Sequence, residues 1–202
     1  MILEKLAIPG VLLVRPEVFE DRRGFFLETY RREVFAAAGV AADFVQDNHS
    51  ASSRTVLRGL HYQLHRAQAK LVRVVRGEVY DVAVDIRSGS PWFGRHCAVR
   101  LSEADKQGVY VPEGFAHGFL VVSERAEIVY KCSDYYCPAH ERGIRWDDPA
   151  LAIDWPLPPG EAPVLSEKDA RYARLSETDP ADLPVYAPPP VRADDGRTPS
   201  KA

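Results

Sequence analysis

Residues 70–86 read KLVRVVRGEVYDVAVDI, and this stretch decides the fold. Valine and isoleucine dominate both halves, and β-branched residues favour strands. The halves meet at Arg76-Gly77, where a glycine permits the backbone angles of a tight turn. The stretch therefore predicts two strands, over 70–76 and 78–86, joined by a hairpin turn.

Short segments of the same kind recur on both sides of this stretch. They are rich in aromatic and β-branched residues and are separated by Pro, Gly or Asp. They lie at residues 11–14, 24–30, 44–48, 97–101, 109–111, 118–122 and 127–133. A helix is predicted over 31–38, ended by Gly39. Many short strands with so little helix predict a mainly β sandwich or jelly roll with a few short helices, rather than βαβ units.

The later part of the chain differs in composition. The chain has 202 residues, enough for one well-buried domain, and 10 of its 16 prolines follow residue 155. Ser166 and Asp169 resemble a helix start, with Ser166 as the cap and Asp169 as a carboxylate variant of the capping box. We expect a single domain over residues 1–180 and a Pro-rich, disordered tail over residues 181–202.

The composition also excludes several functional classes. A net charge of −3 and a pI near 6.1 leave no general basic face for nucleic acid. Arginine supplies 20 of the 26 cations, so a local phosphate site stays open, although high-GC codon usage is the plainer explanation. Charged residues near the N-terminus argue against a signal peptide. No apolar run reaches the roughly 20 residues that a membrane helix requires. The three cysteines include no Cys-x-x-Cys unit. We expect a cytoplasmic protein with reduced thiols and no membrane partner.

Three residues in strand-like sequence suit proton-transfer chemistry. His61 is a candidate general base because imidazole titrates near neutral pH, and a β-bulge at Gly59 would bring Arg58 to the same side of the strand. Lys70 heads an inward apolar row, where an ammonium is favoured beside an anion such as an enolate oxygen. Tyr130 also lies in a strand. Each has a plainer alternative: a structural histidine, a lysine that reaches water, and a buried phenol with one hydrogen-bond partner.

A second histidine raises the question of a metal. Pro112-x-Gly114-x-x-His117 resembles the second metal-binding motif of cupins, but no His-x-His with a following acid stands near His61. Two histidines without a third ligand make a poor transition-metal site. The sequence favours a site without metal and leaves a metal-dependent cupin enzyme as an alternative.

A series of motifs between about residue 2 and residue 170 resembles the dTDP-4-dehydrorhamnose 3,5-epimerase family. The motifs are Gln46-Asp-Asn-His-Ser50, Leu57-Arg-Gly-Leu-His-Tyr-Gln63, Lys70-Leu-Val-Arg73, Gly77-Glu-Val-Tyr-Asp-Val-Ala-Val-Asp85, Pro112-Glu-Gly-Phe-Ala-His-Gly-Phe119, Tyr130-Lys131 with Asp134-Tyr-Tyr136, Pro138-x-His-Glu-Arg142, Trp146-x-Asp-Pro149, Ile153-Asp-Trp-Pro156 and Leu165-Ser-Glu-Lys-Asp169. Their number and their order make the resemblance specific.

The resemblance implies a cupin-type jelly-roll β-sandwich that forms a homodimer, with N-terminal strands crossing to the partner's sheet. It also implies epimerisation of dTDP-4-dehydro-6-deoxy-D-glucose at carbons 3 and 5 to dTDP-4-dehydro-β-L-rhamnose, a step in dTDP-L-rhamnose synthesis for surface polysaccharide. No cofactor and no metal are implied. Both carbons neighbour the 4-keto group, so loss of either proton gives an enolate, and a base and an acid on opposite ring faces invert the centre.

Individual positions match the family's functional residues. His61 matches the proton acceptor, oriented by Asp169, and Tyr130 matches the proton donor. Lys70 matches the residue beside the 4-keto oxygen, and Tyr136 matches an aromatic that stacks on thymine. The positions that match substrate contacts are Arg23, Glu28, Gln46, Asp47, Asn48, Arg58, His117, Glu141 and Lys168, of which Arg23 and Arg58 suit the diphosphate best.

Two further hypotheses remain beside the double epimerase and the metal-dependent cupin enzyme. A mono-epimerase that inverts only carbon 3 or only carbon 5 of the same sugar would carry nearly the same residues, because pocket shape and ring flipping decide the outcome. A non-catalytic sugar-binding module could use the same sandwich, but it leaves Lys70 and Tyr130 without a role.

Overall fold

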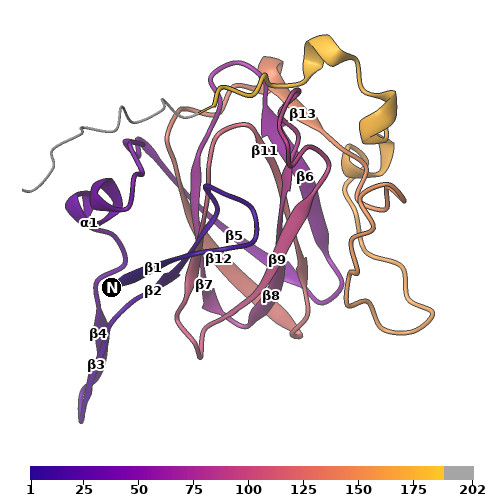
Figure 1. Cartoon of the computed structure of the whole chain (residues 1–202). Coiled ribbons are helices and arrows are strands. Elements are labelled where there is room, and N and C mark those ends of the chain that lie inside the picture. Colours follow the sequence, from indigo (N-terminus) through magenta and orange to yellow (C-terminus); the bar gives the residue numbers. More distant parts are fainter. Residues whose placement is uncertain (189–202) are drawn as a thin grey trace, which may run out of the picture.

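Two antiparallel sheets face one another in the computed structural model, which describes residues 1–188 (Figure 1). The first sheet contains, in spatial order, β1 (Ile2–Lys5), β2 (Leu12–Arg15), β10 (Gly108–Val111), β7 (Lys70–Arg76), β12 (Arg125–Cys132) and β5 (Gln46–Ser53). The second contains β13 (Glu141–Gly143), β6 (Leu57–Gln63), β11 (Phe115–Val121), β8 (Glu78–Asp85) and β9 (His96–Ser102). The predicted mainly β, jelly-roll sandwich is confirmed.

The two strands that flank Gly77 form as predicted, but the prediction that they pair as a hairpin is wrong. Strand β7 pairs with β10 and β12 in the first sheet, whereas β8 pairs with β11 and β9 in the second. Gly77 has φ +75°, and a Cβ there would lie 2.0 Å from the Arg125 carbonyl oxygen. The glycine therefore turns the chain through a crowded corner from one sheet to the other.

The remaining elements are short. They are the strands β3 (Val18–Asp21) and β4 (Gly24–Leu27), the helix α1 (Arg32–Ala37), and the 3-10 turns η1 (Pro138–His140), η2 (Asp169–Arg171), η3 (Leu175–Glu177) and η4 (Pro180–Asp182). The predicted early helix is confirmed, and Gly39 follows it with φ +87°. Among the described helices, none has the length and apolar character that crossing a bilayer requires.

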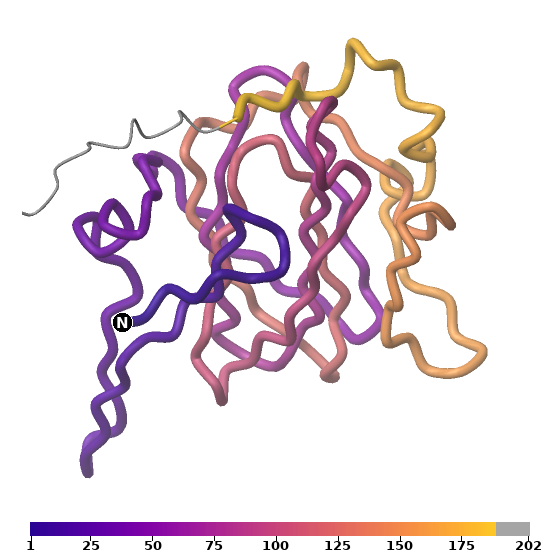
Figure 2. The backbone as a smooth tube through the Cα atoms, viewed as in Figure 1, coloured from indigo at the N-terminus to yellow at the C-terminus, as the bar shows by residue number. Residues whose placement is uncertain are grey.

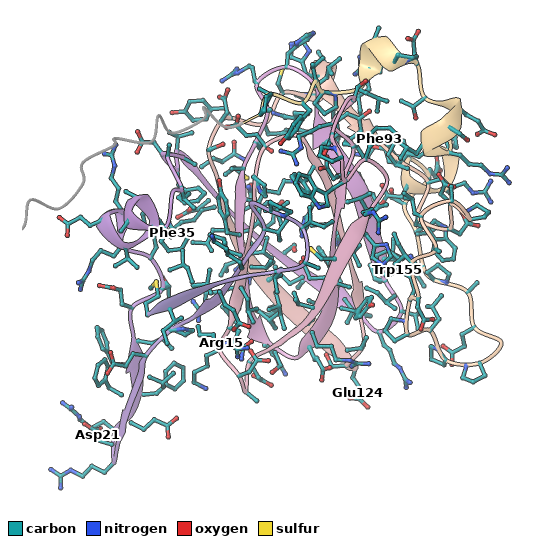
Figure 3. The ribbon with its side chains drawn as sticks, in the orientation of Figure 1. Arg15, Asp21, Phe35, Phe93, Glu124 and Trp155 are labelled. Atoms are coloured by element: carbon teal, nitrogen blue, oxygen red, sulfur yellow. The ribbon has the colours of Figure 1, made fainter. Side chains whose placement is uncertain are left out.

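Strands β3 and β4 form a hairpin of their own that projects from the sandwich (Figure 2). The predicted strand over 24–30 ends at Leu27 and pairs with Val18–Asp21. Asp21 lies at the far end of this hairpin, away from both sheets (Figure 3). The aromatic side chains of this hairpin are exposed, with Phe25 at 59% and Phe26 at 71%.

Three apolar clusters hold the fold together. The largest fills the space between the sheets and includes Val72, Leu101 and Ile128. A second covers the outer face of the first sheet, where Phe35 of α1 packs against Leu12, Val14 and Tyr110. The third joins the outer face of the second sheet to the C-terminal segment through residues that include Leu120, Trp155, Leu175 and Leu183. Because of this cover, β11 is buried on both faces.

The packed part of the chain extends past the predicted domain boundary at residue 180. Leu183 is buried, the Arg142 guanidinium bonds the Asp182 carboxylate at 2.9 Å, and the Tyr186 amide donates to the Ser88 carbonyl. These contacts tie residues 181–186 to the second sheet. The later part of the predicted tail, residues 189–202, lies outside the described residues.

Candidate active site

A cavity of about 760 Å³ opens between the two sheets. One wall comes from β6 and β11, and the facing wall comes from β5, β7 and β12. It gathers most of the residues that the sequence singled out, namely Gln46, Asn48, Arg58, His61, Lys70, His117, Tyr130, Tyr136, Glu141, Lys168 and Asp169.

The predicted β-bulge at Gly59 is confirmed and shapes the first wall. His117 pairs with His61 and Phe119 pairs with Arg58, so β6 holds one more residue than β11 between these pairs. Gly59 has φ +117°, and a Cβ there would lie 2.6 Å from the Gly118 Cα. The bulge lets Arg58 and His61 line the same cavity.

His61 bonds a carboxylate from a distant segment. Its Nε2 lies 2.5 Å from Asp169 Oδ1, and Asp169 is only 3% exposed. Burial raises the pKa of Asp169, but the hydrogen bond and the charge of His61, with help from Ser166 and Lys168, outweigh it and lower the pKa. Asp169 is therefore a carboxylate at neutral pH and accepts a hydrogen bond from the Nε2–H of His61, which leaves the unprotonated Nδ1 as the ring nitrogen that can accept a proton.

A second carboxylate–imidazole pair lies beside the first. His117 Nε2 is 2.9 Å from Asp81 Oδ2, and both residues are buried. Asp81 was not among the predicted site residues, although strand alternation places it on the inward face of β8 with Val79 and Ala83. Within residues 1–188, no group of three or more His, Cys, Asp or Glu side chains is arranged to hold a metal ion.

The facing wall carries an ammonium and a phenol. Lys70 pairs with Cys132 across β7 and β12, and Tyr130 pairs with Val72, so their side chains face the cavity together. Burial lowers the pKa of Lys70, against the smaller opposing effects of Cys132, Asp81 and Glu141. Burial also raises the pKa of Tyr130, which keeps this phenol protonated at neutral pH. The wall therefore offers a proton donor, Tyr130, and a buried lysine whose charged form an anion in the cavity would favour.

A chain of polar side chains lies at the rim. The Tyr136 hydroxyl donates to Glu141 Oε2 and the Lys168 ammonium donates to Glu141 Oε1, each at 2.7 Å. The hydrogen bond to Glu141 raises the pKa of Tyr136 to about 12. On the other strand edge, Gln46 accepts from the Tyr136 amide at 2.9 Å and donates to Asn48. The rim is thus tied across both sheets.

Three of the predicted substrate contacts lie outside this cavity. Arg23 stands at the tip of the β3–β4 hairpin and pairs with Asp21. Glu28 accepts from Arg31 at 2.8 Å. Asp47 faces the outer side of β5, where it pairs with Lys131 at 3.0 Å, because successive side chains of a strand point to opposite faces. Within one chain, these residues do not reach the site.

Comparison with known proteins shows the family of this chain. The family model described as dTDP-4-dehydrorhamnose 3,5-epimerase matches residues 5–177. The chain belongs to the dTDP-4-dehydrorhamnose 3,5-epimerase family. A family member from Pseudomonas aeruginosa is 55% identical over 176 residues, which cover 87% of this chain and 96% of the relative. The predicted family is confirmed.

Solved structures of the family extend the comparison. A dTDP-6-deoxy-D-glucose-3,5-epimerase from Legionella pneumophila, in complex with dTDP-4-keto-L-rhamnose, is 47% identical with a TM-score of 0.89, covering 92% of this chain and 98% of that one. ChmJ, a 3′-monoepimerase from Streptomyces bikiniensis in complex with dTDP-quinovose, is 37% identical with a TM-score of 0.83, covering 90% and 92%. A 3,5-epimerase and a 3′-monoepimerase thus share this fold.

Proposed function

We propose that this chain epimerises dTDP-4-dehydro-6-deoxy-D-glucose at carbons 3 and 5, giving dTDP-4-dehydro-β-L-rhamnose. One observation supports this above all others. An imidazole on one wall of the cavity faces a phenol on the other wall, with an ammonium beside the phenol: His61, Tyr130 and Lys70. This is the set of groups that removal and return of a proton next to a ketone requires.

The first step removes a proton from a carbon next to the 4-keto group. His61 takes this proton at the ring nitrogen that does not bond Asp169, and the electron pair of the C–H bond moves into the carbonyl. The resulting enolate oxygen is stabilised by the ammonium of Lys70, whose charged form the developing negative charge favours. The negative charge of Asp169 favours the imidazolium that forms.

The second step returns a proton from the other face of the ring. The phenol of Tyr130 gives its proton to the enolate carbon, which inverts the centre, and exchange with water then restores Tyr130 and His61. We assign Tyr136 to the thymine and Arg58 to the diphosphate, with Glu141, Lys168, Gln46, Asn48 and His117 as further contacts. Binding energy from the nucleotide can then hold the sugar in place for reaction.

Proton exchange with deuterated water tests the proposed reaction. We expect the wild-type chain to place deuterium at carbons 3 and 5 of the 4-keto sugar nucleotide, detected by mass spectrometry and NMR. His61→Asn should abolish exchange, whereas His96→Asn, a histidine outside the cavity, should leave it intact. Binding of the nucleotide sugar without exchange would instead identify a sugar-binding module. Activity that tracks stoichiometric bound metal would identify the metal-dependent alternative.

A mono-epimerase acting on the same sugar is the second candidate. The similarity to the 3′-monoepimerase ChmJ, at 37% identity and a TM-score of 0.83, supports keeping it. In the exchange experiment it would label one carbon and leave the other unlabelled. Labelling of both carbons would exclude it.

We further propose that the chain works as a homodimer in which the β3–β4 hairpin lies against the partner. Phe19, Phe25 and Phe26 on this hairpin are exposed, which is unfavourable for a monomer in water. Arg23 and Glu28 lie away from their own chain's cavity, so a crossing hairpin would let them serve the partner's site.

Mixing two inactive variants tests the shared site. Arg23→Ala and His61→Asn homodimers should each be weakly active or inactive. If Arg23 serves the partner, a heterodimer holds one complete site, and a random one-to-one mixture should recover about a quarter of wild-type activity. If Arg23 serves its own chain, no heterodimer site is complete and no activity returns. Light scattering of the wild-type chain measures the oligomeric state directly.

The free thiols support a reducing environment. Cys97, Cys132 and Cys137 form no disulfide with one another. We propose a cytoplasmic location on this ground, because thiols stay reduced there. Exclusive recovery of the enzyme in a secreted or periplasmic fraction would contradict it.

A further inference from the structure

The strand position opposite His61 is occupied by a residue without a side chain. In the β13–β6 ladder, Gly143 is the cross-strand partner of His61. A Cβ on Gly143 would lie 2.3 Å from both Cε2 and Cζ of Tyr172. The aromatic ring of Tyr172 therefore lies directly on the glycine and takes the place of a missing side chain beside the imidazole.

The same ring contacts His61 edge-on. The centroids of the two rings are 5.8 Å apart, and their planes are inclined by 70°. Edge-to-face contact is a favoured arrangement of aromatic rings. The bond to Asp169 fixes one nitrogen of the imidazole, and the edge contact restricts rotation of the ring about that bond. The two contacts together define the plane of His61.

The segment that carries Tyr172 is itself held in place. The Arg145 amide donates to the Ala173 carbonyl at 2.9 Å, and the Leu175 amide donates to the buried Asp148 carboxylate at 2.7 Å. Asp169, three positions before Tyr172, belongs to the same segment. One segment thus delivers both the carboxylate and the ring that meet His61.

The chemistry of Tyr172 points to a role for its ring rather than its hydroxyl. Burial, followed by the charges of Glu141 and Asp169, raises the pKa of this phenol, so it stays neutral. Tyr172 is not among the residues that line the cavity. A half-buried neutral ring can shield the hydrogen bond between His61 and Asp169 from water.

We propose that Tyr172 is a positioning residue for the general base: its ring, seated on Gly143, holds the His61 imidazole in the orientation that proton abstraction requires. The proposal rests on the proposed epimerase function, because only a proton-transferring His61 needs a fixed plane. A small misalignment of a catalytic group lowers the rate of the chemical step more than it affects binding.

Two substitutions at Tyr172 separate the ring from the hydroxyl. With the full chain and the 4-keto sugar nucleotide, Tyr172→Ala should lower kcat for deuterium exchange by about tenfold and leave KM within about twofold. Tyr172→Phe keeps the ring and should restore most of the rate. Equal losses in both variants, a change confined to KM, or a wild-type kcat in Tyr172→Ala would each overturn the proposal.

A substitution on the opposite side of the contact gives an independent test. Gly143→Ala should push the ring away and lower kcat as Tyr172→Ala does. In the Tyr172→Ala background the added methyl group has nothing to displace, so the double variant should match the single one. Strictly additive losses would overturn the proposal. Thermal unfolding and binding of dTDP confirm that each variant is folded. Absence of exchange in the wild-type chain would refute the proposed function, whereas wild-type exchange with unaffected variants would refute the positioning role alone.

Discussion

The two carboxylate–imidazole pairs of the cavity differ in what holds them. His117 and Asp81 stand on adjacent strands of one sheet, and their side chains are 9% and 1% exposed. His61 stands on the next strand, but Asp169 comes from an irregular segment 108 positions later. The His61 side chain is 24% exposed. The cross-strand neighbours His61 and His117 thus sit in different environments.

The two pairs are therefore suited to different tasks, one structural and one chemical. The buried pair is fixed by the ladder of β8 and β11 and can stabilise the wall of the cavity. The partly open pair can exchange a proton with a bound sugar and with water, as a general base must. The alignment of the open pair depends on the packing of the segment around Asp169, so substitutions in the open pair should affect the chemistry and substitutions in the buried pair should affect stability.

The largest expected effect is on the chemistry of the open pair. Asp169→Asn removes the charge that favours the imidazolium of His61 and can stabilise the wrong tautomer. We expect kcat for exchange to fall by about 10³-fold. The free energy of unfolding should change by no more than about 1 kcal/mol, measured by urea denaturation. An unfolding free energy lowered by much more than about 1 kcal/mol, with kcat little changed, would contradict a chemical role for the His61–Asp169 pair.

The buried pair should show a larger effect on stability. Asp81→Asn removes the charge from a carboxylate that is 1% exposed and bonded to His117. We expect the free energy of unfolding to fall by about 1.5–3 kcal/mol. Urea denaturation measures this, with Asp105→Asn at an exposed turn as the matched control. Similar losses in Asp81→Asn and Asp105→Asn would show that burial does not distinguish the pair.

The segment that delivers Asp169 depends on a buried carboxylate. Asp148 accepts from the amides of Leu175 and Ala150 at 2.7 and 2.9 Å. Asp148→Asn leaves one oxygen to accept, so we expect a loss of about 1 kcal/mol in unfolding free energy. Faster hydrogen exchange at the Leu175 amide should accompany it. Unchanged protection there would show that Asp148 does not anchor the segment.

The smallest expected effect is the pH dependence of the open pair. The pKa of Asp169 is lowered in the folded chain, so its contribution to stability is present above the unfolded value of about 4. As the pH falls through the lower folded value, this contribution is lost. Stability curves from pH 6 to pH 2 should show this loss in the wild-type chain and less of it in Asp169→Asn. Parallel stability curves for the wild-type chain and Asp169→Asn would show that Asp169 does not cause the loss.

Local rules predicted much of the fold. The strands on both sides of Gly77, the early helix and the bulge at Gly59 follow from residue type and alternation, which act over a few positions. The pairing of the strands beside Gly77 did not follow, because a tight turn can join two strands of one sheet or pass between sheets. Packing against the other strands decides between these outcomes.

The site shows the same division at Asp169. The sequence predicted a capping box, and the Ser166 hydroxyl does accept from the Asp169 amide at 3.1 Å. The carboxylate itself bonds His61, 108 positions earlier in the chain. The resemblance to the family indicated this partner, whereas local pattern could not, because the contact exists only after the segment packs on the second sheet.

The sequence by itself determined the strand-rich character of the chain, the turns at its glycines and the identity of the reactive side chains. These depend on backbone sterics and on side-chain chemistry that each residue carries with it. The tertiary structure alone decided that strands on either side of Gly77 belong to different sheets, that Arg23 lies far from its own cavity, and that the ring of Tyr172 lies on Gly143 beside His61. Such contacts join positions far apart in the chain, and they form only when burial of the apolar faces brings the sheets and the C-terminal segment together.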